Sequence, residues 1–311
     1  PNCNLIQITA NDLGAKVVGA VTIVSNTGAI VTKEEAFEYL GAGNISSVSP
    51  NAGQGTTVVT IQGFELIGGG SEITSVSIAG VVAQIVGDNT DTEEIIVRAI
   101  VGPTAEGEET GDVVVTGDTG VAITAIDAFT YSVVTEIEPA SGQGGTEVTI
   151  TGIKLLASGD EIAKVTLDGI EVDSIVSESE TKIVVIAGAI SHEQDQTGTV
   201  VITIDNGQVV ESVALQDGSL VHEFTYVVPG EITSVSPAQG QLNTVVTIVG
   251  TDLFGQGDYL NNVSLAGVEA DIVSQSNTKV VVNAGVSGET SAGDVILTSE
   301  SGAIVEIAEQ W

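Results

Sequence analysis

A long internal repeat constrains this chain more than any other feature of its sequence. The stretch ISSVSPNAGQGTTVVTIQG, which begins at Ile45, returns as TEIEPASGQGGTEVTITG from Thr135 and as ITSVSPAQGQLNTVVTIVG from Ile232. Self-similarity at a period of roughly 90 to 100 residues indicates one compact unit built several times. The 311 residues of the chain leave room for two or three such units.

Each of the three copies contains a similar hairpin near its end. The hairpin turns are DTG at Asp118, DNG at Asp205 and ESG at Glu300. Their glycines permit the positive φ that a tight β-turn requires. Two of the copies then close on an aromatic pair that begins at Phe129 or at Phe224. We expect these closing aromatic residues to lie in the core of each unit.

The opening residues match only the second half of this unit. An Asn-Thr-Gly turn that ends at Gly28 is followed by Phe37 and Tyr39, as at the end of the complete copies. At the other end of the chain, Trp311 occupies the position of the first closing aromatic residue. We therefore predict four segments: 1–43, the C-terminal half of a repeat; 44–133 and 134–229, two complete repeats; and 230–311, a nearly complete repeat.

The residue types and their alternation predict an all-β fold. Val, Ile and Thr dominate, aromatic residues make up only 3% of the chain, and Met is absent. These preferences suit pleated, half-buried surfaces. The T-x-V-x-I alternation places every second residue on one face of a strand. The residues predicted to face the core are Val59, Ile61, Val148, Ile150, Val246 and Ile248.

The opposite face of these strands is expected to carry exposed aliphatic side chains. Position 147 is Glu in one copy, which marks an outward row that the other copies fill with Val58 and Val245. The same parity predicts that Ile96, Val184 and Val281 also point outward. Such a row is either a solvated β-face or a face covered by the neighbouring repeat. Alternatively, it contacts other chains laterally in a fibre or sheet.

The repeated phrase I-x-x-[VI]-x-P-x-x-G-x-x-x-T-x-V-T-I-x-G resembles the opening of the IPT/TIG domain. It is carried by Pro50, Gly53, Thr57, Val59, Ile61 and Gly63, by Pro139, Gly142, Thr146, Val148, Ile150 and Gly152, and by Pro237, Gly240, Thr244, Val246, Ile248 and Gly250. The resemblance implies tandem immunoglobulin-like β-sandwiches. It does not imply one function, because sandwiches of this kind host many roles. The DNA-binding members of the family use basic loops that this chain lacks, so its resemblance is to the extracellular members.

The charge of the chain excludes several classes of partner. Seven Lys and Arg stand against 42 Asp and Glu, which gives a formal charge of −35. Such a field repels nucleic-acid phosphates and anionic lipid surfaces. No run of 18 apolar residues is present, and no signal-peptide pattern opens the chain. We therefore expect no nucleic-acid partner and no direct membrane contact, and an interior segment of a longer mature protein.

The sequence offers no catalytic constellation and only weak candidates for other sites. Two His and a single Cys leave few ways to build a nucleophile, a base or a zinc site, so we predict neither an enzyme nor a bound cofactor. Calcium is the one ion to consider, and its candidate ligands are Asp88, Asp91 and Glu93. The cluster lacks an EF-hand pattern, and solvated loop charge is the alternative explanation.

Two further kinds of modification site are predicted. Asn44 and Asn262 begin N-glycosylation sequons. Cys3 has no partner for an intrachain disulfide, so it is either a buried thiol or a candidate for an intermolecular thiol bond.

These observations favour an extracellular or cell-surface structural role. We expect a segment of a large filament, appendage or surface coat, whose partners are other copies of itself or neighbouring surface proteins. The alternative is an adhesin or glycan-binding protein in which the repeats form a stalk. Glycan sites usually expose aromatic platforms, whereas the closing aromatic residues of this chain occupy core-like positions.

Overall fold

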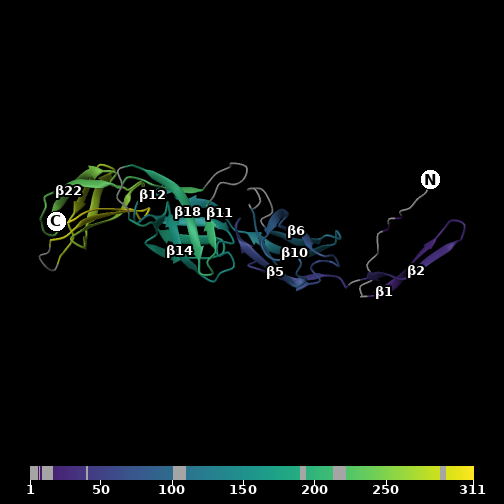
Figure 1. Ribbon diagram of the computed structural model, residues 1–311. Coiled ribbons are helices and arrows are strands. Elements are labelled where there is room, and N and C mark those ends of the chain that lie inside the picture. Colours follow the sequence, from purple (N-terminus) through teal and green to yellow (C-terminus); the bar gives the residue numbers. More distant parts are fainter. Residues whose placement is uncertain are drawn as a thin grey trace. The chain divides into compact units, whose positions relative to one another are not determined.

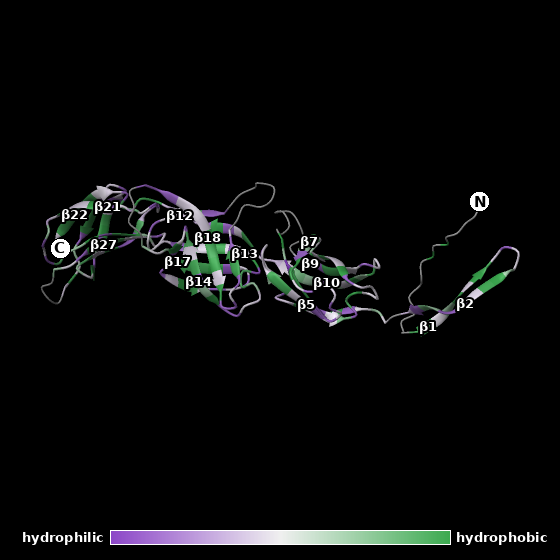
Figure 2. Cartoon of the chain, viewed as in Figure 1, coloured by the Kyte–Doolittle hydropathy of each residue, from purple (hydrophilic) through white to green (hydrophobic). Residues whose placement is uncertain are grey.

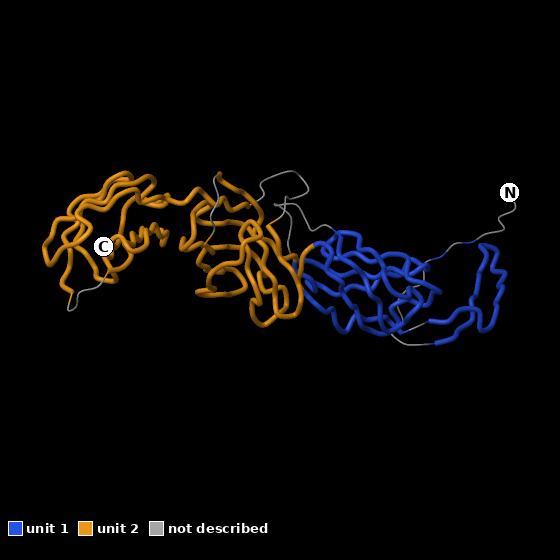
Figure 3. The backbone as a smooth tube through the Cα atoms, turned by 60° about the vertical axis from the view of Figure 1, so that its left-hand side comes forward, with its two compact units in different colours: residues 1–51, 55–102, 108–130 blue, residues 52–54, 103–107, 131–311 orange. Residues whose placement is uncertain are grey.

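The structure is a computed structural model that describes residues 6, 8, 17–39, 41–100, 110–189, 194–212, 222–287 and 292–311. These residues form β-strands joined by turns, which confirms the all-β prediction (Figure 1). Within them no helix is long and apolar enough to cross a membrane. The chain divides into two compact units (Figure 3). Unit 1 comprises residues 1–51, 55–102 and 108–130, and unit 2 comprises residues 52–54, 103–107 and 131–311.

Unit 1 contains a two-layered sandwich built by the first sequence copy. Its strands are β3 (Asn44–Ser49), β5 (Val58–Phe64), β6 (Ile73–Ile78), β7 (Val81–Ile85), β8 (Glu94–Arg98), β9 (Thr110–Gly117) and β10 (Ala122–Tyr131). They pair in the order β3-β5-β8-β7-β6-β9-β10. Strand β7 pairs antiparallel with both β6 and β8, so it joins the two layers.

Unit 2 contains two sandwiches, and the first is built by the second sequence copy. One sheet has the order β11 (Val133–Glu138), β13 (Glu147–Ile153), β17 (Lys182–Ile186) and β16 (Ser174–Ser177). The other has the order β12 (Ser141–Gly142), β20 (Glu223–Tyr226), β18 (Gln196–Ile204), β14 (Ile162–Leu167) and β15 (Ile170–Glu171), with β19 (Val209–Glu211) paired to β18. Their inward side chains form one core that includes Phe224 and Tyr226. Burial raises the pKa of Tyr226 to about 12.

The third sequence copy repeats this architecture. One sheet has the order β21 (Glu231–Ser236), β22 (Val245–Thr251), β26 (Lys279–Asn283) and β25 (Asp271–Ser276). The other has the order β24 (Val268–Glu269), β23 (Leu260–Leu265), β27 (Val295–Ser299) and β28 (Ile304–Ile307). Trp311 is half-buried and contacts the core of this sandwich.

The predicted inward rows are confirmed, whereas the outward row is only partly correct. Val59, Ile61, Val148, Ile150, Val246 and Ile248 are all fully buried. Val58 and Val245 are 45% and 57% exposed, as expected. In contrast, Ile96 and Val281 are half-buried and Val184 is 9% exposed. These three residues lie on β8, β26 and β17, and alternation assigns a face to each of them without fixing how far the side chains of neighbouring strands cover that face.

The glycine that ends the repeated motif is required by a close approach of two strands. Gly152 lies opposite an irregularity in the pairing of β11 with β13, and Gly63 and Gly250 lie opposite the same irregularity in the other copies. A Cβ at Gly152 would overlap the carbonyl oxygen of Val133. Glycine within a strand is typical where another backbone approaches closely.

Replacing Gly152 with alanine should therefore destabilise the second copy. Forcing a methyl group into an occupied space typically costs about 1–3 kcal/mol. A Cβ at Gly19 would meet no other atom within 4 Å, so Gly19→Ala is the control with little effect. Urea unfolding of both variants checks this, and equal midpoints would contradict it.

The opening residues form a β-hairpin with an apolar surface. Strand β1 (Val17–Val24) pairs antiparallel with β2 (Ile30–Tyr39), and both carry hydrophobic colour in Figure 2. Ile30 and Val31 are 65% and 66% exposed. Phe37 is 44% exposed, so its predicted place in a core is wrong. The described residues supply this hairpin with no opposing sheet of a sandwich, whereas Phe129 and Phe224 have one.

Candidate interaction site at the junction of the second and third copies

A short loop between β12 and β13 presents a glutamine in a fixed position. The Oγ1 of Thr146 accepts a hydrogen bond from the backbone N–H of Gln143 at 3.1 Å, and both residues are 1% exposed. A side chain at Gly142 would collide with Thr146, so only glycine permits this close loop. The Gly and Thr of the repeated motif therefore position the glutamine between them.

The side-chain amide of Gln143 bonds to two parts of the third copy. Its Nε2 donates to the carbonyl oxygen of Ile304 at 2.7 Å, and its Oε1 accepts from the backbone N–H of Gly230 at 3.1 Å. Both ends of a buried amide are thus satisfied, as buried polar groups require. The two bonds fix the third copy against the second inside unit 2.

The backbone adds further bonds at the same junction. The N–H of Glu147 donates to the Ser301 carbonyl at 2.9 Å, and the N–H of Ile304 donates to the Gly144 carbonyl at 3.4 Å. A Cβ at Gly145, whose φ is +89°, would lie 2.8 Å from the carbonyl oxygen of Gly302. The β27–β28 hairpin therefore docks through main-chain hydrogen bonds, a mode that resembles the addition of a strand to a sheet edge.

The equivalent glutamine of the first sequence copy makes a related pair of bonds within unit 2. Gln54 follows β4 (Ala52–Gly53), and residues 52–54 belong to unit 2. Its Nε2 donates to the carbonyl of Glu211 at 2.8 Å, and its Oε1 accepts from the N–H of Glu211 at 2.9 Å. Glu211 ends β19, the second strand of the hairpin near the end of the second copy. We call the hairpin at this place in each copy the late hairpin. The same motif glutamine thus bonds to a late hairpin twice in this chain.

A half-open pocket of about 330 Å³ lies beside Gln143. Its lining residues are Gln143, Gly144, Gly145, Asp173, Ile186, Ala187, Ala189, Pro229, Ile304 and Glu306. None of these lining side chains is aromatic, so the pocket does not provide the stacking platform that sugar rings use. In the part of the chain that the structure describes, no group of three His, Cys, Asp or Glu side chains is placed to hold a metal ion.

Each late hairpin also carries a turn carboxylate that accepts hydrogen bonds from a neighbouring loop. Asp118 accepts from the hydroxyl of Ser71 at 2.6 Å and from its N–H, and these bonds lower the pKa of Asp118. In the third copy, Glu300 accepts from the N–H of Asp258 at 2.6 Å and of Tyr259 at 3.1 Å. Burial acts to raise the pKa of Glu300, but these bonds and that from Ser299 favour the ionised form, so the pKa is lowered.

Glu300 should therefore stabilise the hairpin in a pH-dependent manner. Because its pKa is lower in the folded than in the unfolded protein, the stabilisation is complete above the ordinary value of 4.5 and is lost as the pH falls through the folded pKa. We expect the stability difference between the native protein and Glu300→Gln to be larger at pH 7 than at pH 3. Urea unfolding at both pH values measures it, and a difference independent of pH would contradict the assignment.

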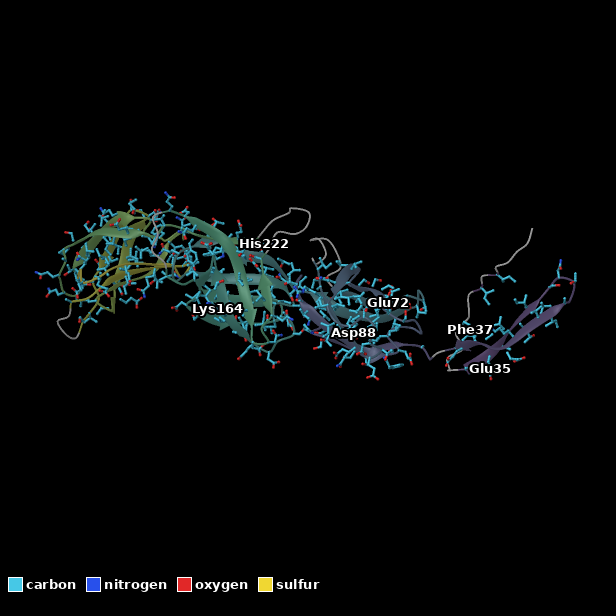
Figure 4. The ribbon with its side chains drawn as sticks, viewed as in Figure 1. Glu35, Phe37, Glu72, Asp88, Lys164 and His222 are labelled. Atoms are coloured by element: carbon cyan, nitrogen blue, oxygen red, sulfur yellow. The ribbon has the colours of Figure 1, made fainter. Side chains whose placement is uncertain are left out.

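The predicted calcium candidates are placed in local turns. Asp88 accepts hydrogen bonds from the N–H and hydroxyl of Thr90 at 2.8 and 2.6 Å, which lower its pKa (Figure 4). Asp91 accepts from the N–H groups of Glu93 at 2.7 Å and of Glu94 at 3.1 Å. These carboxylates therefore already serve as turn acceptors, and Glu93 is exposed. Calcium binding here stays a prediction.

The other predicted site residues lie apart from the junction. Asn44 begins β3, Asn262 lies on β23, and both are exposed. Glycosylation at either position stays a prediction. Cys3 lies outside the described residues. The sequence did not single out Gln143 as functional, although a glutamine recurs at this motif position in all three copies as Gln54, Gln143 and Gln241.

Comparison with known proteins identifies the family. The IPT/TIG domain profile matches residues 132–218 and 231–304. The chain belongs to the IPT/TIG family, with immunoglobulin-like domains in tandem. This result confirms the resemblance carried by the repeated motif.

Solved structures with partial similarity include the plexin A4 extracellular region, with 19% identity, a TM-score of 0.37, and coverage of 81% of this chain and 22% of plexin A4. The SGBP-B protein of the Bacteroides ovatus mixed-linkage glucan utilization locus has 14% identity and a TM-score of 0.27, with 83% and 62% coverage. The Down syndrome cell adhesion molecule has 14% identity and a TM-score of 0.23, with 91% and 44% coverage. This chain therefore spans less than two thirds of each. No curated protein sequence matches it.

Proposed function

We propose that the chain is a structural segment of an extracellular filament, appendage or surface coat built from tandem IPT/TIG repeats. The observation that carries this proposal is the junction at Gln143, where one repeat holds the next through a buried amide and main-chain bonds. The glutamine recurs at this position in all three copies and its partners are backbone groups, so a junction of this kind can recur from one unit to the next. We propose the repeat boundaries 1–43, 44–133, 134–229 and 230–311.

The charge and the exposed surface support the same role. A formal charge of −35 gives strong hydration and repulsion between molecules, which salt screens over about 8 Å at physiological ionic strength. Exposed aliphatic side chains such as Val58, Val82 and Val245 provide surface for contact with other copies. The role requires no catalytic site, and we propose that the chain is not an enzyme.

Negative-stain electron microscopy of the purified chain at low and high salt tests this function. We expect ordered end-to-end polymers whose number increases with salt. Isolated monomers at every salt concentration would contradict the structural role in a filament.

A glycan-binding surface protein is the second candidate, and one observation favours it. The ring of Phe37 is 44% exposed and forms an edge-to-face pair with Tyr39, with centroids 5.0 Å apart (Figure 4). An exposed aromatic ring can stack on a sugar. A glycan array with the native chain and with Phe37→Ala tests this alternative, which requires binding that the substitution removes.

A further inference from the structure

The third sequence copy presents the same loop as the second, with nothing bound to its glutamine side chain among the described residues. The Oγ1 of Thr244 accepts from the N–H of Gln241 at 2.9 Å, as Thr146 does from Gln143. Val245 pairs with Asn283 as Glu147 pairs with Ile186. The framework that holds Gln143 is therefore already formed around Gln241, which is exposed.

The surface around Gln241 is more apolar than its counterpart in the second copy. We call Gln241, Leu242, Val245 and Val286 the end surface. At the matching positions the second copy has Gln143, Gly144, Glu147 and Ala189. Leu242, Val245 and Val286 are 54%, 57% and 73% exposed. Exposed aliphatic residues on the elements that flank a preformed polar anchor are typical of an interaction surface.

The chain also contains a hairpin, β1–β2, that matches the hairpin docked at Gln143 and that pairs with no third strand among the described residues. Gly28-Ala29-Ile30-Val31 is identical in sequence to Gly302-Ala303-Ile304-Val305. Both turns have a glycine with a φ of +85°. Both also close with the same bonds, because the N–H of Ser25 donates to Ala29 and the N–H of Ser299 donates to Ala303, each at 2.9 Å.

The two docked hairpins indicate which register the β1–β2 hairpin can take. Gln143 bonds to Ile304, two residues after the turn glycine, and Gln54 bonds to Glu211, four residues after it. The first register requires Gly145, because a Cβ there would lie too close to the Gly302 carbonyl. The third copy has Asn243 at that position, so only the register seen at Gln54 remains, in which the glutamine bonds to the residue four positions after the turn glycine.

In the second register the partner of Gln241 is Thr32, which lies four residues after Gly28. The Ser25–Ala29 bond closes the turn, and hydrogen-bonded pairs alternate along an antiparallel ladder, so Thr32 directs its N–H and carbonyl away from β1. Glu211 has the same position relative to the Ile204–Gln208 bond.

We propose that the end surface binds the β1–β2 hairpin of a second copy of this chain, with the Gln241 amide bonded to the N–H and carbonyl of Thr32. This inference rests on the proposed filament function and supplies its longitudinal contact. Each molecule carries one end surface and one β1–β2 hairpin, so the contact is head-to-tail and continues from molecule to molecule. Molecules that each carry a formal charge of −35 repel one another, so the association should strengthen as salt screens this repulsion.

Sedimentation velocity of the full chain at several NaCl concentrations tests this contact with two pairs of variants. Val245→Glu introduces the charge that the second copy has at Glu147, and its control is Val273→Glu, since Val273 is 58% exposed on β25 of the same sandwich. Thr32→Pro removes the N–H that would donate a hydrogen bond to the Gln241 side-chain oxygen. Its control is Thr22→Pro, because Thr22 is the ladder partner of Thr32 on the opposite edge.

We expect Val245→Glu and Thr32→Pro each to weaken association at least about tenfold, a loss of about 1.4 kcal/mol, while their controls associate like the native chain. Polymers that are unaffected by both variants would overturn this contact and leave the filament function in place. A native chain that is monomeric at every salt concentration would overturn both this contact and the filament function. The end surface would then bind something other than a second molecule of this chain.

Discussion

Phe224→Ala is expected to lower the free energy of unfolding of its sandwich by about 3–5 kcal/mol, because it removes a large buried ring and leaves a cavity. Phe224 is fully buried and forms an edge-to-face pair with Tyr226, with centroids 5.0 Å apart. Its ring lies in the core of the second copy, among buried side chains of both sheets. Thermal and urea unfolding followed by circular dichroism measure the loss.

The chain supplies a matched control for this substitution. Phe37 has the same place in the repeated sequence and the same edge-to-face partner, but it is 44% exposed. Phe37→Ala should therefore change stability by less than about 1 kcal/mol, as expected for surface positions. Equal losses for Phe37→Ala and Phe224→Ala would contradict the finding that the described residues give this hairpin no opposing sheet.

Gln143→Ala is expected to destabilise unit 2 by about 1–3 kcal/mol, because it leaves the carbonyl of Ile304 and the N–H of Gly230, both in part-buried hydrogen bonds, without their partner. The lower stability should appear as separation of the third copy from the second at a lower denaturant concentration than in the native chain. Hydrogen–deuterium exchange at Gly230, Ile304 and Glu147 reports it directly, since the N–H groups of these residues donate at this junction.

Gln241→Ala is the matched control for the junction. Gln241 occupies the same motif position but is exposed, so its removal should change the stability of the isolated monomer by no more than about 0.5 kcal/mol. Protection factors that are unchanged in Gln143→Ala would show that the junction does not depend on the amide.

The strands and turns of the repeat were predictable from sequence, because they depend on local patterns. Alternation assigned Val148 and Ile150 to the core, and Gly120, Gly207 and Gly302 adopt the positive φ expected of their turns. The burial of Val184 was not predictable, because parity assigns a face to a residue but does not say how far neighbouring strands cover that face. Nor does alternation reveal that the described residues give Phe37 no opposing sheet.

The junction was harder to predict than the fold. The recurrence of Gln54, Gln143 and Gln241 was visible in the repeated motif and could have marked the position as functional. The partner of Gln143 was not visible, because Ile304 lies 161 residues away along the chain. Only the folded structure shows that the glutamine loop of one copy contacts the late hairpin of the next.

The salt dependence of the mass of the chain in solution tests the central claim, self-assembly of tandem repeats, most directly. Light scattering coupled to size exclusion should give 31.4 kDa at low ionic strength, where the charge of −35 keeps copies apart. As NaCl approaches about 1 M and the screening length falls to about 3 Å, the mass should rise through a series of whole multiples. A mass of 31.4 kDa at every salt concentration, at protein concentrations up to the millimolar range, would contradict the account.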